Sequence, residues 1–443
     1  MTIARTICLS FLAVIAVGTI LLMLPISTAT GTWNDPIVAL FTSTSAVCVT
    51  GLAVVDTGSD FSFWGQLFIL LLIQVGGLGY MMITTFLILV LGGRFNLRRK
   101  AAIQESFDRP FLQGSRNLVR SILATTLIFE LTGILLLLYI FADEYGFNEG
   151  IWLAVFHSIS AWNNAGFSLF SDSLVIYRDS ITVNLIISSL VIFGGIGYQV
   201  IIELYCYLAH LAKGEKFRFV FSLNFKVVIS TTLLLLISGT VGFLIIEFST
   251  EQFTSLTGQE KILAAWFQSV STRTAGFNTI DFGQMTTAAL FMTIIFMFIG
   301  ASPSGTGGGI KTTTLRILMN CTKSILQGKE EVVLYQRQVP IPLILKAVGV
   351  VVGSVVTIMI STILIAITDP QINFLQLCFE VVSAFATVGL STGITADISP
   401  LGQLILVFTM YTGRVGILVL MAAILGDAKP SRVQYPEQNL LVG

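Results

Sequence analysis

The sequence predicts an all-α integral membrane protein whose eight transmembrane segments form four span–pore-loop–span repeats, with pseudo-four-fold symmetry around a central pore. Three observations predict this fold: few charges, basic residues gathered on one side of the apolar runs, and a short motif that recurs four times. The chain has 443 residues, of which 54% are hydrophobic and 11% charged. Soluble domains carry about 25% charged residues, so the composition argues against a cytosolic enzyme, a nucleic-acid binder and a disordered chain.

Seven apolar runs are long enough to cross a membrane, which takes about 20 residues. They are Ile7–Leu24, Phe63–Leu91, Ile122–Phe141, Val183–Leu208, Val227–Ile246, Ala347–Ile367 and Gln403–Leu425. An eighth run, Ala288–Gly300, is too short for a hydrocarbon core about 30 Å thick. The first run resembles a signal peptide only loosely, because it exceeds the usual apolar region of about 7–15 residues and further spans follow.

The basic residues predict the orientation of the chain. If the N-terminus is cytoplasmic, the inner connections carry 20 of the 24 Lys and Arg residues. The outer connections carry only Arg178, Lys261 and Arg273, and Arg414 lies inside a span. Because cytoplasmic loops are enriched in Lys and Arg, we expect a multi-pass protein of the plasma (inner) membrane with both termini cytoplasmic.

The residues that usually carry enzyme chemistry are sparse. The five cysteines contain no C-x-x-C pair, and His157 and His210 stand far apart in the sequence. This argues against a zinc site and a disulfide framework and leaves the redox compartment undetermined. No nucleophile–base pair is evident, so we expect neither an enzyme nor a cofactor held by this chain.

A short segment ending in glycine recurs in each outer connection. An aromatic residue stands ten places before each glycine, a small residue five places before it and a large apolar residue one place after it. The segments are Phe41–Gly51, Phe156–Gly166, Trp266–Gly276 and Phe379–Gly389. Such matched columns at a nearly fixed period indicate an internal repeat. The predicted units are residues 1–100, 101–225, 226–340 (with a broken second span) and 341–443 (with a C-terminal tail).

Glycines also mark the second span of the units. Gly76-Gly77-Leu78-Gly79-Tyr80 recurs as Gly194-Gly195-Ile196-Gly197-Tyr198, and more loosely as Gly413-Arg414-Val415-Gly416. We interpret the first two groups as close helix packing through small residues. Every unit begins and ends inside, so the repeat is parallel, unlike the inverted repeats of many transporters.

The physics of the bilayer suggests what such units do. Irregular backbone at membrane depth survives only where it is buried in protein or lines a water-filled cavity. Four loops around one axis would direct backbone carbonyls toward it, and carbonyl rings replace the hydration shell of a cation. The C-terminal ends of the short helices add about half a negative charge each. No ring of four carboxylates is present to hold Ca²⁺, so we expect selection of monovalent cations.

Together, the four loops resemble the filter loops of the Ktr/Trk/HKT potassium transporters, and the chain is most similar to the KtrB-type pore subunit. The matching stretches are Val47–Leu52, Asn163–Phe167, Thr272–Phe277 and Ala386–Ser391. The resemblance implies a K⁺ filter built from Val49, Thr50, Gly51, Asn164, Ala165, Gly166, Thr274, Ala275, Gly276, Thr387, Val388 and Gly389. In that family four filter glycines accompany K⁺ preference. The only metal implied is transported K⁺, with Na⁺ as a candidate activator.

A glycine-rich stretch, Ala301–Thr312, interrupts the second span of the third unit. A phosphate-binding loop is a poor match, because Ile310 separates the glycines from Lys311 and no strand precedes them. A kink without function is another interpretation. The resemblance implies a mobile gate beneath the filter, formed by Gly305, Thr306, Gly307, Gly308 and Gly309, with Lys311 near its cytoplasmic end.

Arg414 stands in the middle of an apolar span, where a charge is costly and therefore indicates a function. The resemblance implies that Arg414 faces the cavity beneath the filter, repels cations and holds carbonyls of the glycine-rich loop. The alternative is a buried ion pair with Glu130 or Glu203. A second pair, between Glu380 and Arg273, is expected behind the filter.

Four aspartates, Asp56, Asp172, Asp281 and Asp397, follow the repeated glycines closely. A ring of carboxylates at an outer mouth would concentrate cations. An ordinary role as solvated loop residues explains these positions equally well.

The leading function is K⁺ uptake by the ion-conducting pore subunit of a Ktr-type transporter; the alternative is a Na⁺-coupled secondary transporter working by alternating access. The chain has no nucleotide-binding motif and no expected nucleic-acid partner. The resemblance implies a homodimer and a cytosolic, nucleotide-binding ring of KtrA type. The basic segment 94–120 would dock that ring or contact anionic membrane lipid, and the apolar tail 438–443 favours burial in an interface.

Overall fold

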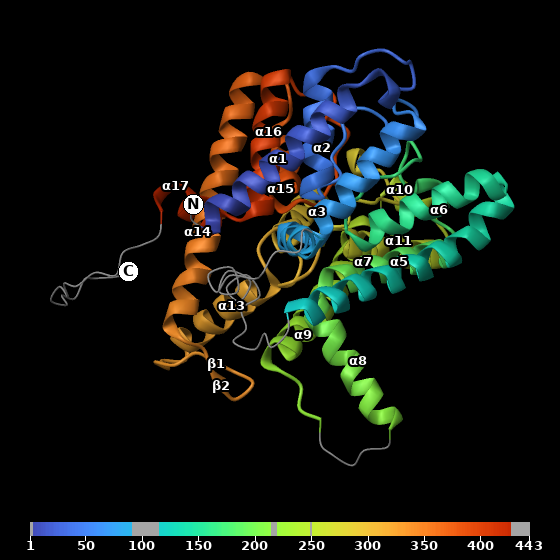
Figure 1. The fold of residues 1–443 in the computed structure, drawn as a ribbon. Coiled ribbons are helices and arrows are strands. Elements are labelled where there is room, and N and C mark those ends of the chain that lie inside the picture. Colours follow the sequence, from blue (N-terminus) through green and yellow to red (C-terminus); the bar gives the residue numbers. More distant parts are fainter. Residues whose placement is uncertain (1–2, 91–114, 214–218, 249, 427–443) are drawn as a thin grey trace.

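The computed structural model describes residues 3–90, 115–213, 219–248 and 250–426, which are mostly helical (Figure 1). The basic segment 94–120 falls largely outside these residues, and the tail 438–443 does so entirely. The predicted boundary at residue 100 also lies outside them.

Each predicted unit contains a long helix, a short helix and a further helix or helix pair. The first unit has α1 (Ile3–Met23), η1 (Pro25–Ser27), α2 (Pro36–Cys48) and α3 (Phe63–Val90). The second has α5 (Ser115–Tyr145), α6 (Phe147–Trp162), η2 (Val175–Tyr177), α7 (Ile181–Ile196) and α8 (Tyr198–Ala212). The third has α9 (Leu223–Glu247), α10 (Glu251–Thr254), α11 (Gly258–Ser271), η3 (Phe282–Gln284), α12 (Thr287–Phe298) and α13 (Thr312–Leu326), followed by a hairpin of β1 (Val333–Leu334) and β2 (Arg337–Gln338). The fourth has α14 (Ile341–Thr368), α15 (Phe374–Ala386), α16 (Pro400–Val415) and α17 (Ile417–Leu425).

The first helix of each unit has the length and composition of a membrane span. Within the described residues, α1, α5, α9 and α14 qualify alone, and the bent pairs α7–α8 and α16–α17 raise the number to six if each is one span. On α14 the side chains of Val352, Met359 and Ile367 are exposed, as expected for a surface that faces lipid. The chain is an integral membrane protein by these features.

Each of the predicted spans 183–208 and 403–425 is broken into two helices. The chain bends by 103° between α7 and α8 and by 95° between α16 and α17. The cause is a single glycine at each break, Gly197 with φ 92° and Gly416 with φ 87°, which is a conformation that other residues rarely adopt. In α3 the same departure from helical geometry occurs at Gly79, with φ 75°.

The packing interpretation of these glycine groups holds for their first members. A Cβ on Gly76 would stand 2.0 Å from the carbonyl oxygen of Val47, and one on Gly194 would stand 2.0 Å from that of Trp162. Each group therefore has two roles: its first glycine lets a short helix approach, and its last glycine breaks the span.

Polar residues start the short helices. The Asp35 carboxylate accepts hydrogen bonds from the Ile37 and Val38 amides at the start of α2. Thr257 and Glu260 form a capping box at α11, and Asn373 caps α15. A cap of this kind contributes about 1 kcal/mol to helix stability. These caps fix where α2, α11 and α15 enter the fold, whereas α6 begins at Gly146 without a side-chain cap.

In three units a serine of the short helix donates to a carbonyl of the preceding long helix. Ser43 donates to Ile15, Ser158 to Glu130 and Ser269 to Leu236, at 2.9, 2.7 and 2.8 Å. A glycine on the long helix makes room for each serine, because a Cβ on Gly18, Gly133 or Gly239 would stand 2.3 Å from the serine oxygen. The short helices are thus held against the long ones by one repeated contact.

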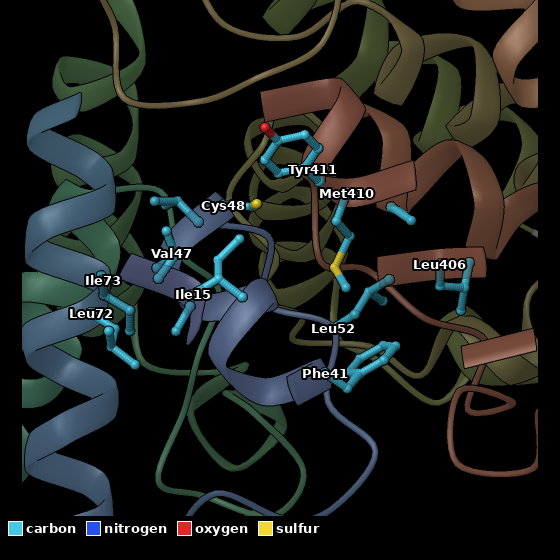
Figure 2. Close-up of a cluster of buried hydrophobic side chains, with 14 of the residues drawn as sticks. Ile15, Phe41, Val47, Cys48, Leu52, Leu72, Ile73, Leu406, Met410 and Tyr411 are labelled. Atoms are coloured by element: carbon cyan, nitrogen blue, oxygen red, sulfur yellow. The ribbon is translucent and has the colours of Figure 1, made fainter. Parts of the chain in front are cut away.

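The first and fourth units pack together, with α1 beside α17 (Figure 1). Figure 2 shows their shared core, in which Phe41 of α2 and Cys48 at its end lie near Met410 and Tyr411 of α16. The Tyr411 hydroxyl donates to the carbonyl of Cys8 in α1 at 2.9 Å. This contact joins the last unit to the first.

Candidate ion site and the loop beneath it

Each short helix ends at the same unusual backbone position. Two residues before each repeated glycine, the chain adopts the left-handed conformation, with φ of 57°, 57°, 67° and 52° at Val49, Asn164, Thr274 and Thr387. This conformation is strained for non-glycine residues, and most of all for β-branched ones. We call these four the rim residues. Their geometry makes the four loops reverse at matching points.

The four loops contact one another in a closed ring. The close contacts that a Cβ on each repeated glycine would make show this arrangement. A Cβ placed on each glycine would strike the carbonyl oxygen just before the glycine of another loop. The distances are 2.4 Å from Gly51 to Ala165, 2.9 Å from Gly166 to Ala275, 2.7 Å from Gly276 to Val388 and 2.1 Å from Gly389 to Thr50. Loop one therefore contacts loop two, two contacts three, three contacts four, and four contacts one. We call Gly51, Gly166, Gly276 and Gly389 the glycine ring.

Of the twelve residues that the sequence assigns to the filter, the ring brings together the four glycines and the residue just before each glycine. All of them are buried except Gly51, which is partly exposed. Any side chain on a ring glycine would displace a carbonyl of the adjacent loop, which is why glycine is required there. Carbonyl oxygens are the kind of ligand that can replace the water around a dehydrated cation.

A cavity of 630 Å³ is lined by all four ring glycines. Asp56, Asp172 and Asp281 line this cavity, and Asp397 is not among its lining residues. The Asp56 carboxylate also accepts from the amides of Gly58 and Ser59, at 2.7 and 3.1 Å. Asp56 therefore shapes its own turn as well as contributing negative charge to this cavity.

Hydrogen bonds behind the ring hold its loops in place. The hydroxyl oxygens of Ser45 and Ser383 accept from the amides of Gly51 and Gly389, each at 3.1 Å. These serines lie on the short helices six residues before their glycines.

Glu380 of α15 is fully buried and holds the return of the fourth loop. One carboxylate oxygen accepts from the Ser391 hydroxyl and from the Thr392 amide at 3.0 Å, and the other accepts from the Thr395 hydroxyl at 3.1 Å. The predicted pair of Glu380 with Arg273 is wrong, because these neutral donors satisfy the carboxylate. In the described part of the structure, Nε of the buried Arg273 has no hydrogen-bond partner.

The second loop has a comparable support at the same position, nine residues before its glycine. Nε2 of the buried His157 lies 3.0 Å from the Ser168 hydroxyl, two residues after Gly166. Sequence reasoning missed both supports. The signal that was available is a polar residue on an otherwise apolar short helix, together with a serine two places after the glycine.

Glu130, the alternative partner for Arg414, contacts a different group. Its carboxylate accepts a hydrogen bond from the side-chain amide nitrogen (Nδ2) of Asn163 at 3.2 Å, and the same nitrogen donates to Oε1 of Gln74 at 2.9 Å. Glu203 accepts from the amide and hydroxyl of Ser222. The Arg414 guanidinium instead donates to the carbonyl oxygens of Thr306 and Gly76. Both proposed ion pairs are therefore replaced by hydrogen bonds to neutral groups.

Residues 299–311, here called the glycine-rich loop, connect α12 to α13. The loop folds back on itself through hydrogen bonds from the Gly300 amide to Ile310 and from the Ala301 amide to Gly308, at 2.9 and 3.2 Å. It also contacts the end of α7, since the Ser302 amide donates to Gly195 at 3.0 Å. The predicted break in the second span of the third unit is thus an ordered loop between two helices.

The glycine-rich loop lies directly against the rim residues. The Thr306 hydroxyl donates to Oδ1 of Asn164 at 3.1 Å, and the Gly308 amide donates to the Thr387 hydroxyl oxygen at 2.9 Å. A Cβ on Gly307 would stand 1.9 Å from the Thr274 hydroxyl oxygen. The loop therefore fits beneath the ring only because it is made of glycine there.

Two cationic side chains hold the loop from its other side. Nζ of Lys311 donates to the carbonyl of Gly307 at 2.8 Å, and Arg414 donates to the carbonyl of Thr306. Both cations line a cavity of 460 Å³ that extends to Gly79 and Asn163. A cation in this cavity would meet two fixed positive charges and a loop that covers the ring.

Among the residues that the structure describes, no group of three or more His, Cys, Asp and Glu side chains is placed to hold a metal ion. Any ion bound at the ring would be held by backbone and neutral oxygens.

Comparison with known proteins identifies the family. The family model TrkH, described as a cation transport protein, matches residues 4–429. The chain is 37% identical over 441 residues to the Ktr system potassium uptake protein B of Bacillus subtilis (strain 168), covering 99% of this chain and 96% of the relative. It is 39% identical over 440 residues to the protein of the same description from Vibrio alginolyticus, covering 99% and 94%.

A third relative is the potassium/sodium uptake protein NtpJ of Enterococcus hirae, which is 34% identical over 438 residues, covering 98% of this chain and 95% of the relative. The crystal structure of the potassium transporter TrkH from Vibrio parahaemolyticus matches with a TM-score of 0.70 and 18% identity, covering 94% of this chain and 84% of that one. The structural match establishes the fold, and the sequence matches extend over nearly the whole chain. The chain therefore belongs to the TrkH family of cation transport proteins.

Proposed function

We propose that this chain is the ion-conducting pore subunit of a Ktr-type system and carries K⁺ into the cell through a filter formed by its four loops. The observation that carries the proposal is the closed glycine ring, in which each loop contacts the next through a carbonyl and a glycine. Two relatives whose described function is potassium uptake support K⁺ as the cargo.

In this proposal the eight membrane segments surround one pore with pseudo-four-fold symmetry. The long helix of each unit and its broken second helix cross the plasma membrane, and both termini are cytoplasmic. The excess of Lys and Arg in the inner connections supports that orientation. The three aspartates that line the cavity at the glycine ring then face the outside, where they raise the local cation concentration.

The glycine-rich loop is the proposed gate, with Gly305, Thr306, Gly307, Gly308, Gly309, Lys311 and Arg414 as its parts. Its position against the rim residues supports a closed state, since a cation leaving the ring would meet the loop next. Deleting residues 305–309 is expected to raise uptake at least about tenfold. Loss of uptake by a deletion variant that still folds would contradict the gate.

Regulation and assembly follow from the same resemblance. The described residues end too early to test the apolar tail, and the chain carries no nucleotide-binding motif. We propose a homodimer that works with a cytosolic nucleotide-binding ring of KtrA type, as the description of its relatives as parts of a Ktr system supports. The potassium/sodium description of one relative supports Na⁺ as a candidate activator.

One observation favours the alternative of Na⁺-coupled alternating access. Discontinuous helices are typical of secondary transporters, and α7–α8 and α16–α17 are broken in this manner. A carrier of this kind needs a coupling-ion gradient and saturates at a low rate, whereas a pore does neither.

The two functions are separated by Rb⁺ uptake into proteoliposomes that contain this chain alone and are loaded with K⁺. The pore proposal predicts uptake without a Na⁺ gradient, inhibited by external K⁺ and little by Na⁺ or Li⁺. Uptake that requires a Na⁺ gradient would support the carrier. If uptake appears only after residues 305–309 are deleted, the intact loop keeps the isolated pore closed.

A further inference from the structure

The glycine-rich loop is polarised in its hydrogen bonding. Toward the ring it presents donors, the Thr306 hydroxyl and the Gly308 amide. Away from the ring it presents acceptors, the carbonyls of Thr306 and Gly307, to Arg414 and Lys311. Its closed position therefore depends on oxygens of the rim residues as well as on the two cations.

The rim residues form a small cluster of oxygens under the ring. Asn164, Thr274 and Thr387 carry polar side chains, whereas the fourth rim residue is Val49. All four are buried, and Nδ2 of Asn164 donates to the Thr274 hydroxyl oxygen at 3.4 Å. Asn164 and Thr387 accept hydrogen bonds from the loop, and the Thr274 hydroxyl is in close contact with Gly307.

A cation that leaves the ring on this side needs the same oxygens. Amide and hydroxyl oxygens coordinate dehydrated monovalent cations much as carbonyls do. The loop's donors direct their hydrogens at the lone pairs of Asn164 Oδ1 and Thr387 Oγ1, which a cation would otherwise use. Gly307 also fills the space beside the Thr274 hydroxyl, so a cation and the loop do not fit there together.

We propose that the glycine-rich loop and the permeating K⁺ compete for the rim oxygens of Asn164, Thr274 and Thr387, so that K⁺ reaching the rim releases the loop. The proposal rests on the proposed function and deepens it. The closed loop and K⁺ cannot occupy the rim at the same time. K⁺ at the rim therefore favours the open loop, and the closed loop lowers the affinity for K⁺ by the same factor. External K⁺ reaches the rim through the filter. Lys311 and Arg414 line the cavity on the other side, where their positive charges repel cations.

The test is a cycle of variants assayed by Rb⁺ uptake over a range of K⁺ concentrations. Thr387→Val removes the rim oxygen but keeps the shape and the β-branch, so the backbone strain at this position is unchanged. In the intact chain the two effects oppose each other, because the loop loses one hydrogen bond while K⁺ loses one oxygen ligand, so uptake at low K⁺ is expected to change less than in Thr306→Val. In the chain lacking residues 305–309, where the loop cannot compete, Thr387→Val is expected to raise the half-saturating K⁺ concentration about two- to tenfold without increasing the maximal uptake.

Thr306→Val tests the loop side alone. It removes the donor to Asn164 and leaves the rim intact, so uptake at low K⁺ is expected to rise while the half-saturating concentration falls or stays constant. Thr44→Val is the matched control, because the buried Thr44 hydroxyl of α2 has no hydrogen-bond partner among the described residues. Thr387→Ser keeps the oxygen, so in the chain lacking residues 305–309 its half-saturating K⁺ concentration is expected to stay below that of Thr387→Val. Size-exclusion elution identifies any variant that does not fold.

The outcomes separate two failures. If deleting residues 305–309 raises K⁺-selective uptake but neither Thr387→Val nor Thr306→Val changes uptake or half-saturation, the competition is overturned and the gate stands. A serine variant that behaves like the valine variant overturns it as well, since the oxygen is then not the cause. If no form of the chain takes up Rb⁺ selectively, the proposed function itself fails.

Discussion

The glycine ring and the second helices beneath it differ in how far the four units have diverged. In the ring, every unit has a left-handed residue two places before its glycine, and every glycine contacts another loop. Beneath it, single glycines at Gly79, Gly197 and Gly416 break three of the units, whereas the third unit has the whole loop 299–311. Four matching loops can surround a spherical ion with similar ligands. The loop 299–311, which the third unit has in place of a single glycine, can act as a gate.

The largest effect that sharpens this comparison is expected at Glu380, whose carboxylate holds the return of the fourth loop. Glu380→Gln keeps the volume but loses the charge and cannot satisfy all three donors. Because hydrogen bonds to a charged group are stronger than neutral ones, the loop should loosen and the K⁺/Na⁺ uptake ratio should fall about tenfold.

The matched control is Glu247→Gln. Glu247 is also fully buried, but it accepts from the amide and hydroxyl of Thr286 at the start of α12, away from the ring. It should lower stability without changing the K⁺/Na⁺ ratio. Equal losses of selectivity in both variants would mean that Glu380 acts only through general stability.

A smaller effect is expected at the breaks of the second helices. Gly197 and Gly416 both have positive φ, so alanine strains either backbone by about 1–2 kcal/mol. A Cβ on Gly197 would also stand 2.5 Å from the carbonyl of Pro303 in the glycine-rich loop, whereas one on Gly416 meets no atom within 4 Å. Gly197→Ala should therefore raise Rb⁺ uptake by displacing the loop, by about threefold more than Gly416→Ala.

Uptake that is equal in these two alanine variants, with similar losses of thermal stability, would show that backbone strain and not loop contact sets the gate. This pair thus tests whether the second unit's break takes part in gating or merely bends the helix.

The smallest effect concerns Asp369, the residue that directly follows α14. Burial raises the pKa of Asp369, but hydrogen bonds from Thr368 and Ser399 outweigh burial and lower the pKa below its ordinary value. A lowered folded-state pKa stabilises the fold above the ordinary pKa, and this contribution is lost as the pH falls through the lowered value. Asp369→Asn should lower the melting temperature by about 2 °C at neutral pH and by less in acid.

Asp397→Asn, on an exposed part of the following loop, is the control for that measurement. A melting temperature of the Asp369→Asn variant that stays equally reduced at every pH would mean that shape rather than charge is responsible.

The sequence predicts the pore segments well because their signals are local. The aromatic residue ten places before each glycine is fully buried at Phe41, Phe156 and Phe379, and each short helix ends a few residues before its glycine. These columns lie within each short helix and its return loop, so a fixed spacing in the sequence reveals them.

The breaks at Gly79, Gly197 and Gly416 could not be predicted in the same way. Glycine serves both a close helix contact and a positive φ, and composition does not distinguish the two. Gly76 and Gly194 allow a close helix contact, whereas the third glycine of each group, Gly79 or Gly197, adopts a positive φ.

The pairing of Glu380 with Arg273 failed for a different reason. Opposite charges in neighbouring short helices suggest a pair, but the donors to Glu380 come from Ser391, Thr392 and Thr395 in a loop without periodicity. The path of such a loop is fixed by the glycine ring and not by local sequence preference.

The central claim, that the glycine ring selects the ion, is tested most directly by the K⁺/Na⁺ uptake ratio of Gly389→Ser in proteoliposomes. Of the four ring positions, a Cβ here would come closest to a carbonyl oxygen, at 2.1 Å from Thr50. We predict a ratio about 10- to 100-fold lower, from an overpacking cost of about 1–3 kcal/mol. Gly51→Ser, whose Cβ would stand 2.4 Å from the carbonyl oxygen of Ala165, should lower the ratio by a smaller factor. Gly258→Ser, whose Cβ would meet no atom within 4 Å, should leave the ratio unchanged. An unaltered ratio in a folded, conducting Gly389→Ser variant would contradict the claim.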